Sequence, residues 1–204
     1  MKSERNYGID LLRLILMYMV CVLHTLGHGG ILGACVKETI PYKVFWLLEI
    51  CSYCAVDGFA LISGYMISNK PCKYEKIVEM WIQALFYSLV LTLLLKVIGV
   101  NFEWGRTDIL KSVLLITYDR FWYFTAYFCS FFVAPFINQF VLEISEKKAK
   151  IYFIVFLSLF GIIGFIADTF KTEEGYSAFW LIILYYIGAF AKQGKVFEKR
   201  KHMF

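Results

Sequence analysis

The chain has 204 residues, of which 60% are hydrophobic and 19% aromatic, and its formal net charge is +5. Ordinary soluble domains are roughly 45–50% apolar, so this composition excludes a water-soluble globular protein. Apolar runs of about 20 residues, long enough to cross about 30 Å of hydrocarbon, recur along the whole chain. The predicted spans are Ile9–Leu26, Val44–Ser68, Met80–Val100, Phe121–Ile144, Ile151–Phe170 and Ala178–Ala191. The sequence therefore predicts an all-α polytopic membrane helix bundle of about six transmembrane helices. We expect a single membrane-embedded domain over residues 1–204.

The distribution of Lys and Arg predicts the orientation of these spans, because short cytoplasmic loops collect basic residues. With the N-terminus inside, the predicted inner segments hold 13 of the 21 basic residues and the outer segments hold 6. We therefore expect a multi-pass protein of the cell membrane with both termini in the cytoplasm. The positive net charge reflects this topology, and we expect the lipid bilayer rather than a nucleic acid as a partner.

The first predicted span carries two ionisable residues, Arg13 and His24, within the apolar sequence "IDLLRLILMYMVCVLHTLGHGG". Such residues are expensive in hydrocarbon, so an intramembrane Arg or His indicates a functional site. On an α-helix the two side chains project from one face, about 20° apart and about 16 Å apart along the axis. Asp10 lies three residues before Arg13 and can form an ion pair with it. In the alternative interpretation, Arg13 reaches the interface and His24 hydrogen-bonds within the bundle.

Two patterns along the chain are typical of metal or redox sites. His24 and His28 have a spacing that suits metal or haem ligation, but the glycines around His28 are expected to end the helix there. Cys51 and Cys54 form a C-x-x-C pair, which lies in a predicted membrane helix rather than at the start of a redox helix. Cysteines in such spans usually behave as small hydrophobic residues. We expect no metal site and no permanently bound cofactor.

Three stretches together resemble the membrane-bound acyltransferase family 3. The opening helix "RNYGIDLLRLILMYMVCVLHTLGHGG" matches the family signature of an Arg followed, after ten intervening residues, by a His, here Arg13 and His24. The stretch "FALISGYMI" is similar to the Phe-rich Ser-Gly-Tyr motif of the family, and "FWYFTAYF" to its Trp-Tyr-Phe motif. The resemblance implies about ten helices, each of about 20 residues. We therefore expect this chain to be the N-terminal six-helix portion, incomplete at its C-terminus.

The resemblance implies transfer of an acyl group, usually acetyl, from acyl-CoA to a hydroxyl or amine of a cell-envelope glycan, lipid or similar acceptor. An imidazole exchanges protons near neutral pH and suits a general base, so His24 is the candidate for taking the acceptor proton. A guanidinium binds phosphate through two parallel hydrogen bonds, so Arg13, supported by Asp10, is the candidate for holding the donor. Acyl-CoA is thus an expected co-substrate, most simply acetyl-CoA.

Further polar and aromatic residues are candidates for acceptor binding or support. They are Asp57, Ser63, Tyr65, Trp122 and Tyr123. A carboxylate inside a span is expected to be paired or functional, so Asp57 is predicted to orient His24 or to pair with Arg13. Trp122 and Tyr123 begin the fourth span, where aromatic residues also serve as interfacial anchors.

Two other classes of function are compatible with the same residues. In a non-enzymatic membrane transporter or binding module, Arg13, Asp57 and His24 would line a proton or anion path. In a truncated, inactive remnant of the acyltransferase they would have no current role.

Overall fold

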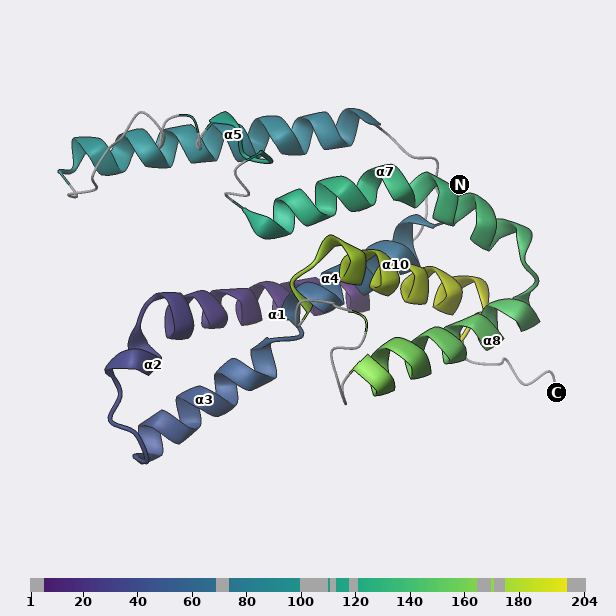
Figure 1. Ribbon diagram of the computed structural model, residues 1–204, viewed down its shortest axis with the longest axis horizontal. Helices are drawn as coiled ribbons and strands as arrows, with labels where there is room; N and C mark the ends of the chain where they lie inside the picture. Colours follow the sequence, from purple (N-terminus) through teal and green to yellow (C-terminus); the bar gives the residue numbers. More distant parts are fainter. Residues whose placement is uncertain are drawn as a thin grey trace.

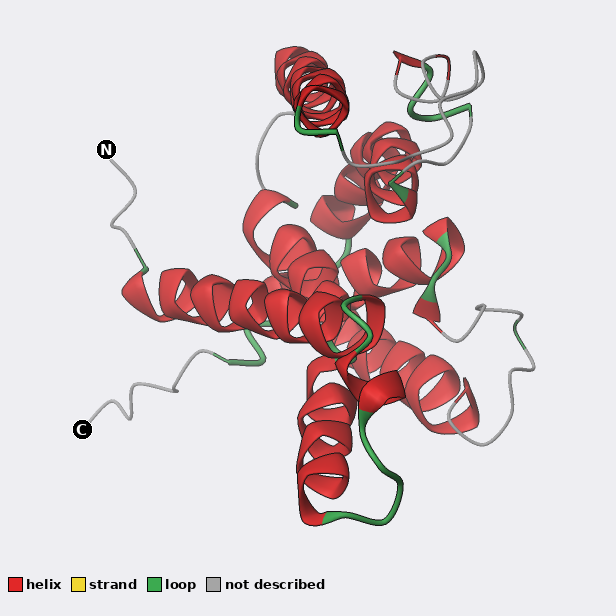
Figure 2. Cartoon of the chain, turned by 90° about the vertical axis from the view of Figure 1, so that its left-hand side faces the viewer, coloured by secondary structure: helices red, strands yellow, loops and turns green. Residues whose placement is uncertain are grey.

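The computed structural model describes residues 6–68, 74–99, 110, 113–117, 121–164, 170 and 175–197. Within these ranges every regular element is a helix (Figure 2). Four helical stretches are long and apolar enough to cross a membrane, judged by length and composition within the same ranges. They are Tyr7–His28, Ile40–Met66, Tyr74–Val97 and Trp122–Glu143. The predicted helical membrane bundle is confirmed.

The first span begins as α1 (Tyr7–Leu23) and ends as a π-helical turn, η1 (His24–His28). The side chain of Asn6 caps the start of α1 by accepting a hydrogen bond of 3.2 Å from the Ile9 backbone N–H. Beyond η1 the chain reverses at Gly30, whose φ of 78° lies in the left-handed region that glycine adopts without steric cost. The glycines therefore end the helix just after His28, as the sequence predicts.

The second span is interrupted, which hydropathy did not predict. After the short α2 (Ile31–Ala34), the chain forms α3 (Ile40–Ser52) and then α4 (Ala55–Ile67), drawn as separate helices in Figure 1. The buried Ser52 hydroxyl donates 2.7 Å to the Leu48 carbonyl just before the interruption. Such hydrogen bonds from a side chain to the preceding turn compete with the helical pattern and often bend helices.

The third and fourth spans are α5 (Tyr74–Val97) and α7 (Trp122–Glu143). α5 lies at one side of the bundle in Figure 1, and its Tyr74 ring packs edge-on against Phe131 of α7 at 5.9 Å. Only 17% of its most apolar stretch is buried inside the protein. Exposed apolar side chains of this kind are expected on a helix that faces lipid.

The fifth and sixth predicted spans are shorter helices. α8 (Glu146–Phe156) continues as the π-helical η2 (Leu157–Ile163), and part of the predicted span Ile151–Phe170 lies outside the described residues. α10 (Ala178–Gln193) has 16 residues and is apolar. Serine caps begin both helices, as Ser145 does for α8.

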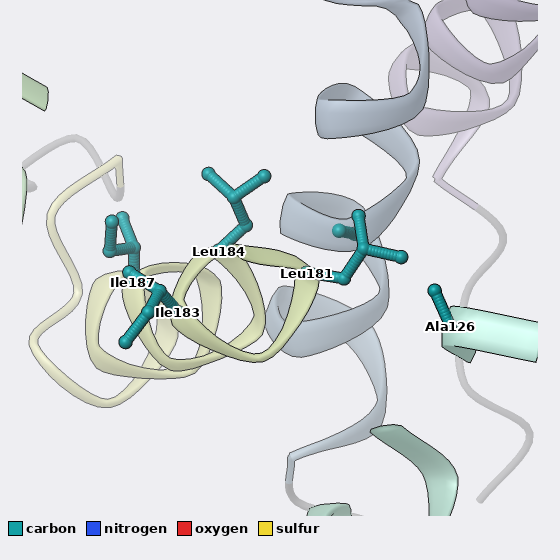
Figure 3. Close-up of a cluster of buried hydrophobic side chains, with 6 residues drawn as sticks. Ala126, Leu181, Ile183, Leu184 and Ile187 are labelled. Carbon is teal, nitrogen blue, oxygen red and sulfur yellow. The ribbon is translucent and has the colours of Figure 1, made fainter. Parts of the chain in front are cut away.

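α10 forms the centre of the bundle and packs against α4, α7 and α8. Figure 3 shows its buried side chains with Ala126 of α7. This cluster consists of Ala60, Ala126, Leu181, Ile183, Leu184 and Ile187. α4 and α10 approach closely at two glycines: a Cβ at Gly64 would lie 2.8 Å from the Tyr185 carbonyl carbon, and one at Gly188 would lie 3.0 Å from the Tyr65 backbone nitrogen. Small residues at such positions are typical of membrane helix interfaces.

The contacts also show how the helices run relative to one another. Asp57 bonds Trp180 near the starts of α4 and α10, and Gly64 meets Tyr185 further along both, so these two helices run in the same direction. Lys195, just after α10, pairs with Glu146 at the start of α8, so those helices are antiparallel. Asn6, just before α1, and Phe197, just after α10, line the same cavity. The start of α1 and the end of α10 therefore lie on the same side of the bundle. The arrangement agrees with alternating spans, while the side that faces the cytoplasm remains a prediction.

Candidate functional site

Arg13 and Asp10 form the predicted ion pair on α1. The Arg13 Nη1 lies 3.6 Å from the Asp10 Oδ1, and the Arg13 side chain is 45% exposed. An exposed pair of this kind adds little stability in water, so its main effect is to hold the guanidinium near the helix surface. The α-helical backbone continues to His24, whose φ of −66° and ψ of −35° are helical. Arg13 and His24 therefore project from the same face of α1.

His24 and His28 lie side by side in the turn η1. Their ring centroids are 5.1 Å apart with a tilt of 33° between the planes, and both residues are exposed. A π-helical turn is rare and frequently occurs at functional sites. Here the turn places side by side the two imidazoles whose spacing the sequence analysis noted.

Glu49 of α3 packs beneath this turn. It is 6% exposed, and a Cβ at Gly27 would lie 2.8 Å from its Oε1. His28 lies close enough to interact electrostatically with the carboxylate. The sequence marks Glu49, like Asp57, as a carboxylate inside a predicted span that is expected to be paired or functional, but it does not indicate which helix Glu49 faces.

Asp57 has a different partner from those predicted. Its Oδ1 accepts a hydrogen bond of 2.8 Å from the Trp180 indole Nε1, which joins α4 to α10. Gly58, the next residue, packs on Leu16, eight residues before His24 and so about 12 Å from it along α1. In the described structure Asp57 therefore bonds Trp180 rather than His24, and the ion pair of Arg13 is with Asp10. The indole N–H satisfies the carboxylate because both lie in the first turns of neighbouring parallel helices.

Trp122 and Tyr123 lie beside the Asp57–Trp180 pair. The Trp122 ring packs 4.9 Å from the Tyr176 ring, and Tyr123 is within electrostatic range of Asp57. The structure thus brings together three of the predicted acceptor-side residues. It adds Trp180, which the sequence analysis missed because its position after the Ser177 cap is also typical of an interfacial anchor.

The other two predicted supporting residues are separate from this cluster. The Ser63 hydroxyl donates a hydrogen bond of 2.8 Å to the Phe59 carbonyl, so its donor is already used within α4. The Tyr65 ring lies under the Lys192 ammonium, 5.1 Å from nitrogen to ring centroid. Tyr65 also lines a cavity, so it remains available to a ligand, whereas Ser63 serves its own helix.

The cavity lies among α1, α4, α8, η2 and α10 and has a volume of about 720 Å³. Its walls are mainly apolar, and its polar lining includes Asn6 and Tyr65. Ile9 also lines it, and on a helix Arg13 lies about 40° around the axis from Ile9. A volume of this size is within the range of small-molecule sites. Arg13 itself does not line the cavity, but it lies one helical turn after Ile9, which does.

A comparison with family models decides the classification of the chain. A model described as an acyltransferase domain, that of acyltransferase family 3, matches residues 6–204. The chain belongs to acyltransferase family 3. No curated protein and no solved structure matches it.

Membership of acyltransferase family 3 supports a membrane acyltransferase in general terms. The motif "FALISGYMI" occupies α4, where Gly64 provides the close approach to α10. The motif "FWYFTAYF" opens α7 beside Asp57. Two of the three motif stretches therefore build the helix interfaces around the cavity and the aromatic cluster. Within the part of the chain that the structure describes, no group of three or more His, Cys, Asp and Glu residues is placed to hold a metal.

Proposed function

We propose that this family member transfers an acyl group, most simply acetyl, from acyl-CoA to a hydroxyl or amine of a cell-envelope glycan or similar acceptor. The observation that carries the proposal is the placement of Arg13 and His24 on one exposed face of α1, within a chain matched by the acyltransferase family. The first residue suits an anionic donor and the second suits proton transfer.

Arg13 is proposed to bind a phosphate group of CoA. Its guanidinium offers two parallel N–H donors to phosphate oxygens. The ion pair with Asp10, at 3.6 Å and exposed, is weak enough to be replaced by a hydrogen-bonded pair with phosphate. The neighbouring cavity of about 720 Å³ would accept the less polar arm of the donor. Lys192, over the Tyr65 ring, adds a second cation at the cavity wall.

His24 is proposed to act as the general base. The imidazole would take the proton of the acceptor hydroxyl as its oxygen attacks the thioester carbon. The carbon–sulfur bond then breaks, and the proton passes from the imidazolium to the CoA sulfur. The products are the acylated acceptor and free CoA thiol, so atoms and charge balance without a further reactant.

The Asp57 cluster is proposed to recognise the acceptor. Trp122, Tyr123 and Trp180 present aromatic surfaces with polar edges beside one carboxylate. Aromatic rings with nearby hydrogen-bonding groups suit the apolar faces and hydroxyls of a sugar. This supports a carbohydrate-containing acceptor.

The donor part of the proposal is tested by Arg13→Lys, which keeps the charge but loses the planar fork. Membranes with equal amounts of each protein are supplied with radiolabelled acetyl-CoA at a range of concentrations, and label in the membrane fraction is counted. Membranes without the protein give the background. We expect a half-saturating acetyl-CoA concentration at least about tenfold higher in the variant, the loss of one good charge-assisted contact.

An unchanged half-saturating concentration in Arg13→Lys would exclude Arg13 as the donor clamp. Transfer no greater than background from the native chain would contradict the proposed activity itself.

A further inference from the structure

Glu49 is buried without full hydrogen bonding, which is costly in a membrane protein. Among the residues that the structure describes, it is the charged residue in the buried class, with 6% of its surface exposed. Within the same residues its Oε2 accepts no hydrogen bond. A carboxylate in this state is expensive, and ionisable groups kept inside membrane proteins usually serve function.

The surroundings of Glu49 direct this carboxylate at the histidine turn. Its Oε1 lies against Gly27, where any larger side chain would place a Cβ at 2.8 Å. Gly27 lies between His24 and His28 in η1, and His28 is within electrostatic range of Glu49. The His24 ring is 5.1 Å from the His28 ring. The Glu49 carboxylate, the His28 imidazole and the His24 imidazole therefore follow one another in that order across the α3–η1 contact.

We infer that Glu49 is a positioning residue for the His28–His24 pair, an inference that rests on the proposed role of His24 as base. A neutral imidazole has one N–H donor and one acceptor nitrogen, and the hydrogen bond at one nitrogen fixes which is which. The Glu49 carboxylate, whose Oε2 is free to accept a hydrogen bond, favours the His28 tautomer and ring orientation that turn an N–H toward it. His28 in turn holds the adjacent His24 ring with its acceptor nitrogen toward the substrate.

A purely structural Glu49 predicts a different pattern of variants. Replacing an unpartnered buried charge by an apolar side chain of similar size is often neutral or stabilising. Glu49→Met would then give a stable protein with unaltered histidines and activity. The positioning role predicts the same stability but altered histidines and slower transfer, so stability and function separate in one variant.

The test compares native protein with Glu49→Met and Glu49→Gln in lipid bilayers. The first readout is the ¹⁵N spectrum of the imidazole nitrogens at one fixed pH, recorded without substrate. We expect one defined His28 tautomer in the native chain, a mixture in Glu49→Met, and retention of the preference in Glu49→Gln, whose amide oxygen still accepts an N–H. A tautomer unchanged in Glu49→Met would overturn the inference.

The second readout is the maximal rate of label transfer from acetyl-CoA. We expect Glu49→Met to lower it by at least about tenfold, toward the loss seen on removing a general base. The half-saturating acetyl-CoA concentration should stay unchanged, because Glu49 contacts Gly27, which is about 21 Å from Arg13 along the first span. A native maximal rate in a correctly folded Glu49→Met would also overturn the inference.

Gly27→Ala provides a second test of the positioning role. The variant keeps Glu49, but the added Cβ at 2.8 Å from its Oε1 displaces the carboxylate. Its control is Gly33→Ala in the following short helix, where a Cβ would meet nothing within 4 Å. We expect the first variant to mix the His28 tautomers and the second to leave them unchanged. If the native chain transfers no acetyl group, the proposed function fails while the spectra still decide the positioning role. If native and Glu49→Met both transfer normally, the positioning role alone fails.

Discussion

Gly64→Ala should disrupt a close contact between α4 and α10. A Cβ at this position would lie 2.8 Å from the Tyr185 carbonyl carbon and 3.0 Å from its Cα. Carbon atoms pack best at about 3.5–4.0 Å, so α4 and α10 must separate by about 1 Å. The obstacle is backbone, which cannot rotate away as the end of a side chain can. Overpacking of a well-packed core costs about 1–3 kcal/mol, and we expect the upper half of this range.

The matched control for this prediction is Gly164→Ala at the end of η2, where a Cβ would meet nothing within 4 Å. Alanine favours helix over glycine by about 1 kcal/mol, so this variant should be neutral or slightly more stable. The assay is the midpoint of reversible denaturant unfolding of purified protein in one detergent, followed by far-ultraviolet circular dichroism. Equal midpoints for Gly64→Ala and Gly164→Ala would refute the argument that the α4–α10 contact depends on a missing Cβ.

Two further predictions concern residues at or near helix ends. With the native cysteines replaced, a cysteine at Lys148 should react with a membrane-impermeant thiol reagent only from the cytoplasmic side. A cysteine at Lys37 should react only from outside. Reversed labelling would contradict the predicted orientation. Hydrogen bonds from Lys150 and Lys195 lower the pKa of the Glu146 carboxyl. Because this pKa is lowered in the folded protein, the contacts stabilise the fold at neutral pH. That stabilisation is lost as the pH falls through the pKa of Glu146. Lys195→Ala should raise the Glu146 midpoint in a ¹³C carboxyl titration, and an identical midpoint would show that the pair does not form.

Much of the fold could be predicted from local chemistry in the sequence. Long apolar runs identify membrane helices because the backbone must satisfy its own hydrogen bonds in lipid. The cap at Asn6 and the left-handed Gly30 follow from the preferences of those residue types. The Arg13–Asp10 pair was predictable because both residues lie on adjacent turns of one helix.

The remaining features depend on contacts between helices, which the sequence does not reveal by itself. Asp57 bonds Trp180, 123 positions later in the chain, and nothing in either local pattern identifies the other. Glu49 and Gly27 similarly meet only because the chain reverses between α1 and α3. The interruption between α3 and α4 contains neither Pro nor Gly, so the usual helix-breaking signals were absent.

The most direct test of the account is the rate of acetyl transfer in His24→Ala, compared with His202→Ala as a control at another of the three histidines. Membranes with equal amounts of native or variant protein receive saturating radiolabelled acetyl-CoA, and initial label incorporation is measured. The account predicts a loss of about 100-fold or more for His24→Ala, the scale of removing a positioned general base, and a native rate for His202→Ala. A native rate in His24→Ala would contradict the central claim that this imidazole takes the acceptor proton.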